Sequence, residues 1–140
     1  MYDTFRPERP MALADFIRCA NACTRTVTPM ALVKKLRAKE DLLLIDVREH
    51  AEYEAGHIPG ARLVPRGIIE AAADPTYSKH VPEISSARGR QVVVYCATGG
   101  RSAMVAAVLQ MMGFRDVLNL EGGYVRWDDE GMPEIHEASY

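Results

Sequence analysis

Two short, unbroken apolar segments constrain the fold of this chain more than any other feature. Residues 41–46 read Asp-Leu-Leu-Leu-Ile-Asp, and residues 91–95 read Gln-Val-Val-Val-Tyr. Such segments are typical of strands that are buried on both faces of a parallel sheet. Shorter strands are expected at 26–27, at 61–64 and at 117–120, which makes five strands alternating with helical patterns. The sequence therefore predicts an α/β fold with a mainly parallel, five-stranded sheet and the strand at 91–95 near its centre.

Apolar residues recur at helical spacing between the strands. Thr28 followed by Pro29 is typical of a helix start, because threonine caps free amides and proline suits the first helical position. Gly113 ends the most regular of these patterns. The expected helices cover residues 12–23, 29–39, 49–55, 67–73, 102–112 and 122–130, and a polar connection covers 74–89.

The charge balance and the apolar runs exclude several classes of partner. The chain has 140 residues, 17 Lys and Arg against 19 Asp and Glu, and a net charge of −2. That length fits one domain, and nucleic-acid binding is not expected without a basic excess. No apolar run approaches the roughly 20 residues of a membrane span, so no membrane association is expected. Residues 1–10 are polar and lack the apolar core of a secretory signal, so we expect a soluble, cytoplasmic protein.

The three cysteines do not form a disulfide framework, since an odd number leaves at least one free thiol. Cys19 and Cys23 lie four residues apart on the apolar side of the first predicted helix, and we expect packing to bury both. The four histidines show no paired spacing of the kind that binds zinc. No metal or other cofactor is therefore expected.

Cys96 occupies the most reactive position in the predicted fold. It follows the central strand and precedes a helix, and Gly99 and Gly100 allow a tight connection between the two. Backbone amides of such a loop can converge on one point, where the positive end of the helix dipole also favours an anion such as a thiolate. Arg101 adds a fixed cation at the end of the loop. The alternative is that Cys96 is a small buried residue and that the glycines serve only the turn.

Four segments match one known family in order and in spacing. They are Asp-Val-Arg at 46–48, Gly-His-Ile-Pro-Gly-Ala at 56–61, the loop from cysteine to arginine at 96–101, and the Gly-Gly, Trp and Gly-x-Pro pattern within 121–133. On these segments the chain resembles the rhodanese-like sulfurtransferases, in particular the single-domain members. The resemblance covers residues 26–133. It leaves an N-terminal extension over 1–25, with one amphipathic helix, and a C-terminal tail over 134–140.

The resemblance implies a five-stranded, mainly parallel sheet with helices on both faces, preceded by the N-terminal helical extension. It also implies that Cys96 attacks the outer sulfur of a small sulfur-containing anion such as thiosulfate and holds that sulfur as a persulfide. The acceptor would be a thiol, cyanide or the thiol of a protein. The loop residues expected to bind the substrate are Ala97, Thr98, Gly99, Gly100 and Arg101. Arg66, just past the third strand, either reaches the anionic donor or is a solvated charge.

Two other activities use the same cysteine. A persulfide carrier or sensor would load Cys96 without steady turnover. A phosphatase or arsenate reductase would also need the cysteine loop, but related dual-specificity phosphatases have one more residue in it, and only residues 97–100 lie between Cys96 and Arg101 here. Neither the loop nor the next helix contains an Asp or Glu that could protonate a leaving oxygen. Both observations favour sulfur over phosphate.

Structural interpretations are expected for four further residues. Asp46 and Arg48 either form an ion pair at the end of a strand, which we favour, or hold the Cys96 loop. His57 lies within a turn and is expected to be a hydrogen-bonded structural residue, because the proposed chemistry needs no base. Trp127 is expected in the core.

Overall fold

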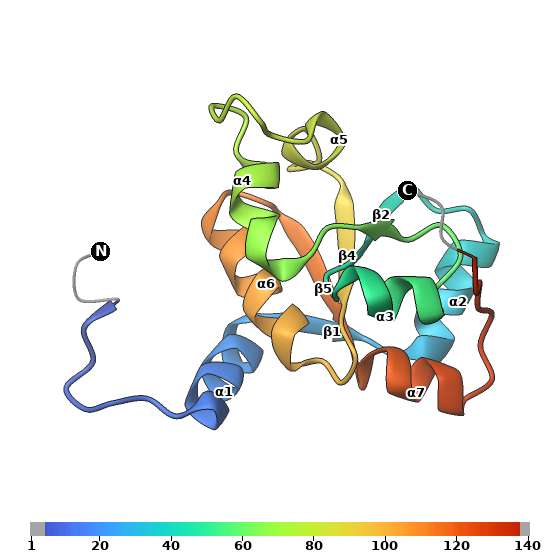
Figure 1. Ribbon diagram of the computed structural model, residues 1–140, viewed down its shortest axis with the longest axis horizontal. Helices are drawn as coiled ribbons and strands as arrows, with labels where there is room; N and C mark the ends of the chain where they lie inside the picture. Colours follow the sequence, from blue (N-terminus) through green and yellow to red (C-terminus); the bar gives the residue numbers. More distant parts are fainter. Residues whose placement is uncertain (1–4, 138–140) are drawn as a thin grey trace.

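The computed structural model describes residues 5–137, which form one sheet with helices around it (Figure 1). The extension over 1–25 and the tail over 134–140 lie partly outside the described residues. The strands are β1 (Arg25–Val27), β2 (Leu42–Asp46), β3 (Arg62–Leu63), β4 (Gln91–Tyr95) and β5 (Asp116–Leu120). The helices are α1 (Leu13–Cys23), α2 (Pro29–Arg37), α3 (His50–Ala55), α4 (Ile69–Ala73), α5 (Pro82–Ser85), α6 (Gly100–Met111) and α7 (Gly123–Asp129), with a 3₁₀ turn, η2 (Arg66–Ile68), before α4.

The five strands form a single sheet in the order β1-β5-β4-β2-β3. Each neighbouring pair of these strands is parallel, so the prediction of a mainly parallel, five-stranded sheet is confirmed. β4 is the middle strand, as the sequence predicts. Parallel strands end at the same edge of a sheet, so Asp46 of β2, Cys96 after β4 and Asn119 of β5 lie along one edge.

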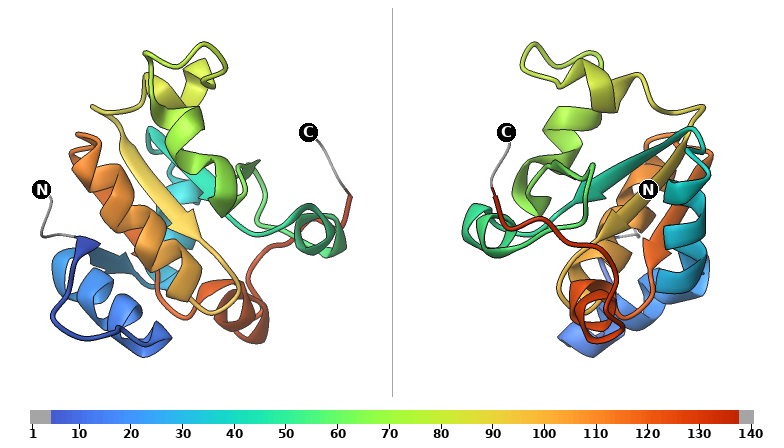
Figure 2. Two further views of the ribbon diagram at one scale, coloured as in Figure 1. Left: turned by 60° about the vertical axis from the view of Figure 1, so that its left-hand side comes forward. Right: turned by 90° about the vertical axis from the view of Figure 1, so that its right-hand side faces the viewer.

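Both faces of β4 are covered, which explains its unbroken apolar sequence. Val92 and Val94 pack into one cluster with side chains of α4, α5 and α6. Val93 and Tyr95 pack into a second cluster with side chains of α2 and α7. Figure 2 shows α4 and α6 on one side of β4 and α2 on the other. Successive residues of a strand point to opposite faces, so a strand between two helical layers needs apolar residues throughout.

The helix α1 packs against α6 beside the Cys96 loop (Figure 1). The side chain of Ile17 lies over Gly100, and Ala20 is the one residue of this helix that is fully buried. The prediction that Cys19 and Cys23 are buried is wrong, because both are exposed. Gln110 of α6 donates to the Cys23 carbonyl at 2.9 Å, so α6 contacts the backbone of this residue while its side chain stays exposed.

Several boundaries differ from those that the sequence predicts. The helix after Cys96 begins at Gly100, two residues earlier than expected, so part of the loop is the first turn of α6. The segment expected as a connection contains α5, whose four residues are too few to show a helical period. The helix expected over 67–73 is divided into η2 and α4.

In the described part of the chain, no helix is long and apolar enough to cross a membrane.

Candidate active site

Cys96 lies at the carboxyl end of β4, immediately before the turn into α6. The residue is 1% exposed, so its sulfur lies at the base of the loop. Two groups point at that sulfur: the amide of Gly99 donates to Sγ at 3.1 Å, and the hydroxyl of Ser102 lies 3.3 Å from Sγ. Gly99 has a φ of +107°, a conformation that side chains rarely adopt. The Gly99 amide thus donates a hydrogen bond to the Cys96 sulfur from the turn that begins α6.

The first turn of α7 holds the backbone of the loop. The amides of Tyr124 and Val125 donate to the carbonyls of Cys96 and Ala97, at 2.8 and 3.0 Å. Gly123 makes this close approach possible, because a Cβ at its position would lie 2.5 Å from the Ala97 oxygen. Both carbonyl oxygens are thus bound to α7, which fixes the orientation of the two peptide groups that begin the loop.

Ser102 belongs to a buried hydrogen-bond network that sequence reasoning missed. Its hydroxyl lies 2.6 Å from Oδ1 of Asn119, and the Asn119 amide donates to the carbonyl of Gly99 at 3.1 Å. The network joins the first turn of α6 to β5. It ends at Gly99, the residue whose amide donates to Sγ of Cys96. A hydroxyl has one proton, so Ser102 donates either to Asn119 or to a Cys96 thiolate. The one signal in the sequence was a polar asparagine between two leucines of β5, Leu118 and Leu120.

Arg101 is held by a carboxylate from α3. Its two Nη atoms donate to the two oxygens of Glu52, each at 2.9 Å. The hydrogen bond from Arg101 lowers the pKa of Glu52 to about 2. Glu52 in turn raises the pKa of Arg101, and Cys96 raises it to a smaller degree. Arg101 is therefore fixed beside the loop, but Glu52 neutralises much of the positive charge that the sequence led us to assign to it.

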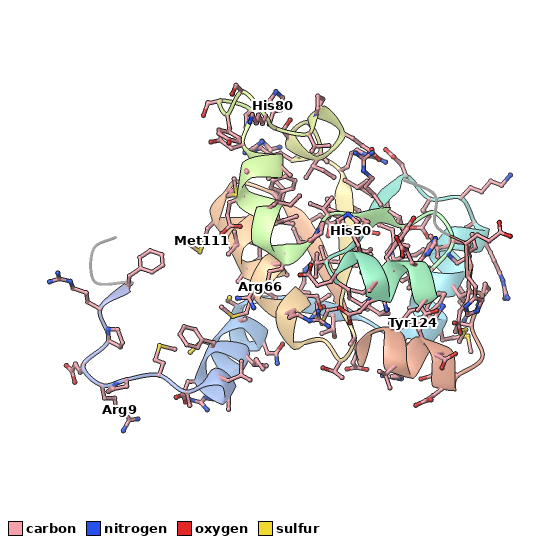
Figure 3. All side chains as sticks on the ribbon, viewed as in Figure 1. Arg9, His50, Arg66, His80, Met111 and Tyr124 are labelled. Atoms are coloured by element: carbon pink, nitrogen blue, oxygen red, sulfur yellow. The ribbon has the colours of Figure 1, made fainter. Side chains whose placement is uncertain are left out.

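A pocket of about 310 Å³ opens beside the Cys96 loop. Thr98, Gly100 and Arg101 line it from the loop and from the first turn of α6, and Arg66 lines it from η2. Figure 3 shows Arg66 near α1 and the start of α6. Arg66 therefore lies on the same rim as the loop. This is the position it would need in order to reach an anionic donor, the first of the two roles considered for it from the sequence.

Asp46 and Arg48 form the buried ion pair that the sequence predicts. Nε and Nη2 of Arg48 donate to the two carboxylate oxygens of Asp46 at 3.0 and 2.8 Å. His57 is also buried, with Nδ1 2.9 Å from the Tyr53 carbonyl and its ring stacked on the ring of Tyr53. Trp127 is buried in the core. The predicted ion pair, the hydrogen bond of His57 and the core position of Trp127 are therefore all present in the structure.

One family model matches most of the chain. The model of the rhodanese-like domain covers residues 29–130. The chain belongs to the rhodanese-like family. The resemblance based on the four sequence segments is thus confirmed. In this rhodanese-like chain, α1 lies before the first residue that the family model matches.

Three relatives illustrate the similarity. A protein of Allochromatium vinosum named "Sulfurtransferase" is 37% identical over 105 residues, which are 75% of this chain and 89% of that protein. "Probable adenylyltransferase/sulfurtransferase MoeZ" of Mycobacterium tuberculosis is 36% identical over 110 residues, 79% of this chain but only 26% of that protein. The structure of RPA3614 from Rhodopseudomonas palustris, described as a possible tyrosine phosphatase, matches with a TM-score of 0.83 and 31% identity over 91% of this chain and 97% of that one.

Proposed function

We propose that this rhodanese-like chain is a sulfurtransferase that moves a sulfane sulfur from thiosulfate or a similar donor to a thiophilic acceptor through a persulfide on Cys96. One observation carries the proposal: the Gly99 amide and the Ser102 hydroxyl converge on the Cys96 sulfur at the start of α6. Hydrogen bonds to a charged group contribute about 1.5–3 kcal/mol each. They therefore favour the thiolate, which is the form of cysteine that attacks sulfur.

The reaction has two steps on the same sulfur atom. In the first, the Cys96 thiolate attacks the outer sulfur of thiosulfate, a new S–S bond forms, and sulfite leaves with the electron pair of the broken S–S bond. In the second, the acceptor attacks the outer sulfur of the persulfide, and Cys96 leaves as a thiolate. The Gly99 amide supports negative charge on Sγ at the beginning and at the end of this cycle.

Phosphate chemistry is supported less well by the site. Glu52 is a carboxylate that the fold brings to the loop, although it lies outside the loop sequence. A general acid must carry its proton at the working pH, whereas Arg101 lowers the pKa of Glu52 to about 2. Glu52 is therefore ionised at neutral pH and does not protonate a leaving oxygen. Because RPA3614 is described as a possible tyrosine phosphatase, hydrolysis of an aryl phosphate is the competing activity to measure.

The intact mass of the protein after incubation with thiosulfate tests the proposal. The wild-type protein and the double variant Cys19→Ser/Cys23→Ser should each gain the mass of one sulfur atom, and Cys96→Ser should gain none. The double variant is a necessary control because Cys19 and Cys23 are both exposed. A gain of sulfur that persists in Cys96→Ser would refute the assignment of the nucleophile.

Turnover separates an enzyme from a carrier. With thiosulfate and cyanide together, a sulfurtransferase produces thiocyanate over many cycles, whereas a persulfide carrier or sensor loads Cys96 without appreciable turnover. The proposal expects steady turnover that depends on Cys96. A single stoichiometric burst would instead support the carrier, and release of phosphate from an aryl phosphate would support the phosphatase.

A further inference from the structure

The hydrogen bonds around Ser102 have a direction that follows from what each group can donate or accept. The Gly99 carbonyl only accepts, so the Asn119 atom that lies 3.1 Å from it is the amide nitrogen, Nδ2. The other end of this amide, Oδ1, also only accepts, and it lies 2.6 Å from Oγ of Ser102. Ser102 therefore supplies the proton of that contact. Its hydroxyl has no second proton, so its lone pairs face the sulfur of Cys96.

A neutral Cys96 thiol completes a closed ring of hydrogen bonds. The Gly99 amide donates to Sγ at 3.1 Å, and the thiol proton points to Oγ of Ser102, 3.3 Å away. Ser102 donates to Asn119, and Asn119 donates to the Gly99 carbonyl. The ring thus begins and ends at Gly99, and each of its donors has an acceptor. Because Ser102 and Asn119 are both buried, bulk solvent does not replace a bond that is lost.

A Cys96 thiolate fits this ring less well than the thiol does. The ionised sulfur has no proton to give to Ser102, and the lone pairs of the hydroxyl then face a negative charge. The hydroxyl supports the thiolate only after it has turned its proton from Asn119 to Sγ. That rotation leaves Oδ1 of Asn119 without its donor, so the bond between Ser102 and Asn119 is lost. The Asn119 contact therefore opposes a charge that Ser102 itself is able to stabilise.

We propose that Asn119 is a positioning residue, which directs the Ser102 hydroxyl and thereby limits the support that this hydroxyl gives to the Cys96 thiolate. When the thiol ionises, its proton passes to the solvent, and the Ser102 hydroxyl keeps its own proton but turns it to Sγ. In the persulfide the negative charge lies on the outer sulfur, so the hydroxyl turns back to Asn119. This inference rests on the proposed sulfurtransferase function and names a residue that tunes the nucleophile of that site.

The titratable groups around the sulfur stay the same when the ring is altered. Arg101 of α6 interacts with the cysteine side chain, and Glu52 of α3 holds Arg101. Asp46, on the neighbouring strand β2, is held in its own buried ion pair. Burial raises the pKa of Tyr95, at the end of β4, and of Tyr124 on α7, so both phenols stay protonated near neutral pH. Changes in the ring are therefore compared against a constant set of charges.

The rate of alkylation of Cys96 by iodoacetamide, measured against pH, tests the inference. Intact mass follows the reaction, and the rate rises with the fraction of thiolate. The pH at which the rate is half-maximal therefore reports how readily the thiolate forms. All variants carry Cys19→Ser and Cys23→Ser, because these exposed thiols would also be alkylated.

Asn119→Leu should lower the pH of half-maximal alkylation by about 0.5–1 unit, which corresponds to one net hydrogen bond. The substitution frees the Ser102 proton for the sulfur. The Gly99 carbonyl, 3.3 Å from Oγ, competes for this proton, but a charged acceptor binds a donor more strongly. Leucine is close to asparagine in size, and the Gly99 carbonyl keeps its bond from the Ala103 amide at 3.0 Å, so the loop stays held.

Ser102→Ala provides the matched control. By itself it removes the hydroxyl and should raise the pH of half-maximal alkylation. In that background Asn119→Leu should leave the profile in place, because no hydroxyl remains to be directed. An effect that Asn119 exerts through packing or through the loop backbone would instead be the same in both backgrounds. If circular dichroism shows that Asn119→Leu does not fold, Asn119→Ala takes its place in the same cycle.

The outcomes keep the two proposals apart. A profile that Asn119→Leu leaves in place or moves to higher pH would overturn the inference, as would an equal downward shift in the Ser102→Ala background. Iodoacetamide carries no sulfane sulfur, so these results do not depend on whether the protein transfers sulfur. Incubation with thiosulfate tests that separately. Wild-type protein that gains no sulfur atom would overturn the proposed function, while the alkylation profiles would still decide the role of Asn119.

Discussion

Gly123 provides a direct test of how α7 holds the Cys96 loop. A Cβ at this position would lie 2.5 Å from the Ala97 oxygen and 2.7 Å from the Cys96 oxygen, and the φ of Gly123 is +61°. Gly131 has a similar φ of +69°, but a Cβ there would meet no other atom within 4 Å. Gly123→Ala and Gly131→Ala therefore share the conformational cost of a positive φ, and only the first adds a clash.

The expected losses follow from these two contributions. A positive φ costs about 1–2 kcal/mol for a residue with a Cβ, so Gly131→Ala should lower the free energy of unfolding by that amount and keep its activity. The clash in Gly123→Ala involves backbone atoms, which no side-chain rotation relieves, and it adds about 1–3 kcal/mol. We expect Gly123→Ala to lose about 2–5 kcal/mol in total. Displacement of the loop should also slow persulfide formation by about tenfold or more.

Two measurements on folded variants decide this prediction. Urea unfolding followed by the fluorescence of Trp127, the one tryptophan of the chain, gives the stability. Intact mass against time gives the rate of persulfide formation, after circular dichroism has shown that each variant is folded. Equal losses of stability in the two variants, with unchanged persulfide formation in Gly123→Ala, would refute the role assigned to α7.

Two further predictions concern the polar contacts around the loop. Glu52→Gln should lower the free energy of unfolding by about 1 kcal/mol at pH 7, a value reduced for the exposure of its ion pair with Arg101. The pKa of Glu52 in the folded protein is about 2, below its ordinary value of 4.5, so the difference from wild type should be full above pH 4.5 and should disappear toward pH 2. Urea titrations across that range check the sign, and a difference that grows in acid would contradict it. Ser102→Ala leaves Oδ1 of Asn119 without its donor, so it should cost about 1–3 kcal/mol of stability in urea. It should also slow persulfide formation on Cys96, and a wild-type rate measured by intact mass would show that the hydroxyl is dispensable.

The sheet and the position of Cys96 could be predicted because both follow from local patterns. An unbroken apolar strand implies cover on both faces, and a cysteine directly after such a strand lies at the carboxyl edge of the sheet, where parallel sheets bind their ligands. The ion pair of Asp46 and Arg48 could be predicted for the same reason, since the two residues lie only two positions apart in the sequence.

The remaining features depend on how elements meet in space. Periodicity showed which residues of α1 share a face, but it did not show which of them another element buries, so Cys19 and Cys23 were placed wrongly. Glu52 reaches Arg101 from α3, and Asn119 reaches Ser102 from β5. No spacing rule connects residues that are so far apart in the chain.

Most of the groups that hold the backbone near Cys96 follow it in the chain. Asn119 binds the carbonyl of Gly99, and Gly123, Tyr124 and Val125 hold the backbone at the cysteine. A ribosome makes the chain from its amino end, so Cys96 emerges before any of these groups exists. Until α7 has been synthesised and has docked, the loop at the cysteine lacks the hydrogen bonds that hold its backbone. Under the proposed function, nascent chains are thereby spared the reactivity of the finished protein, because Cys96 gains these contacts only when the fold around it has been assembled.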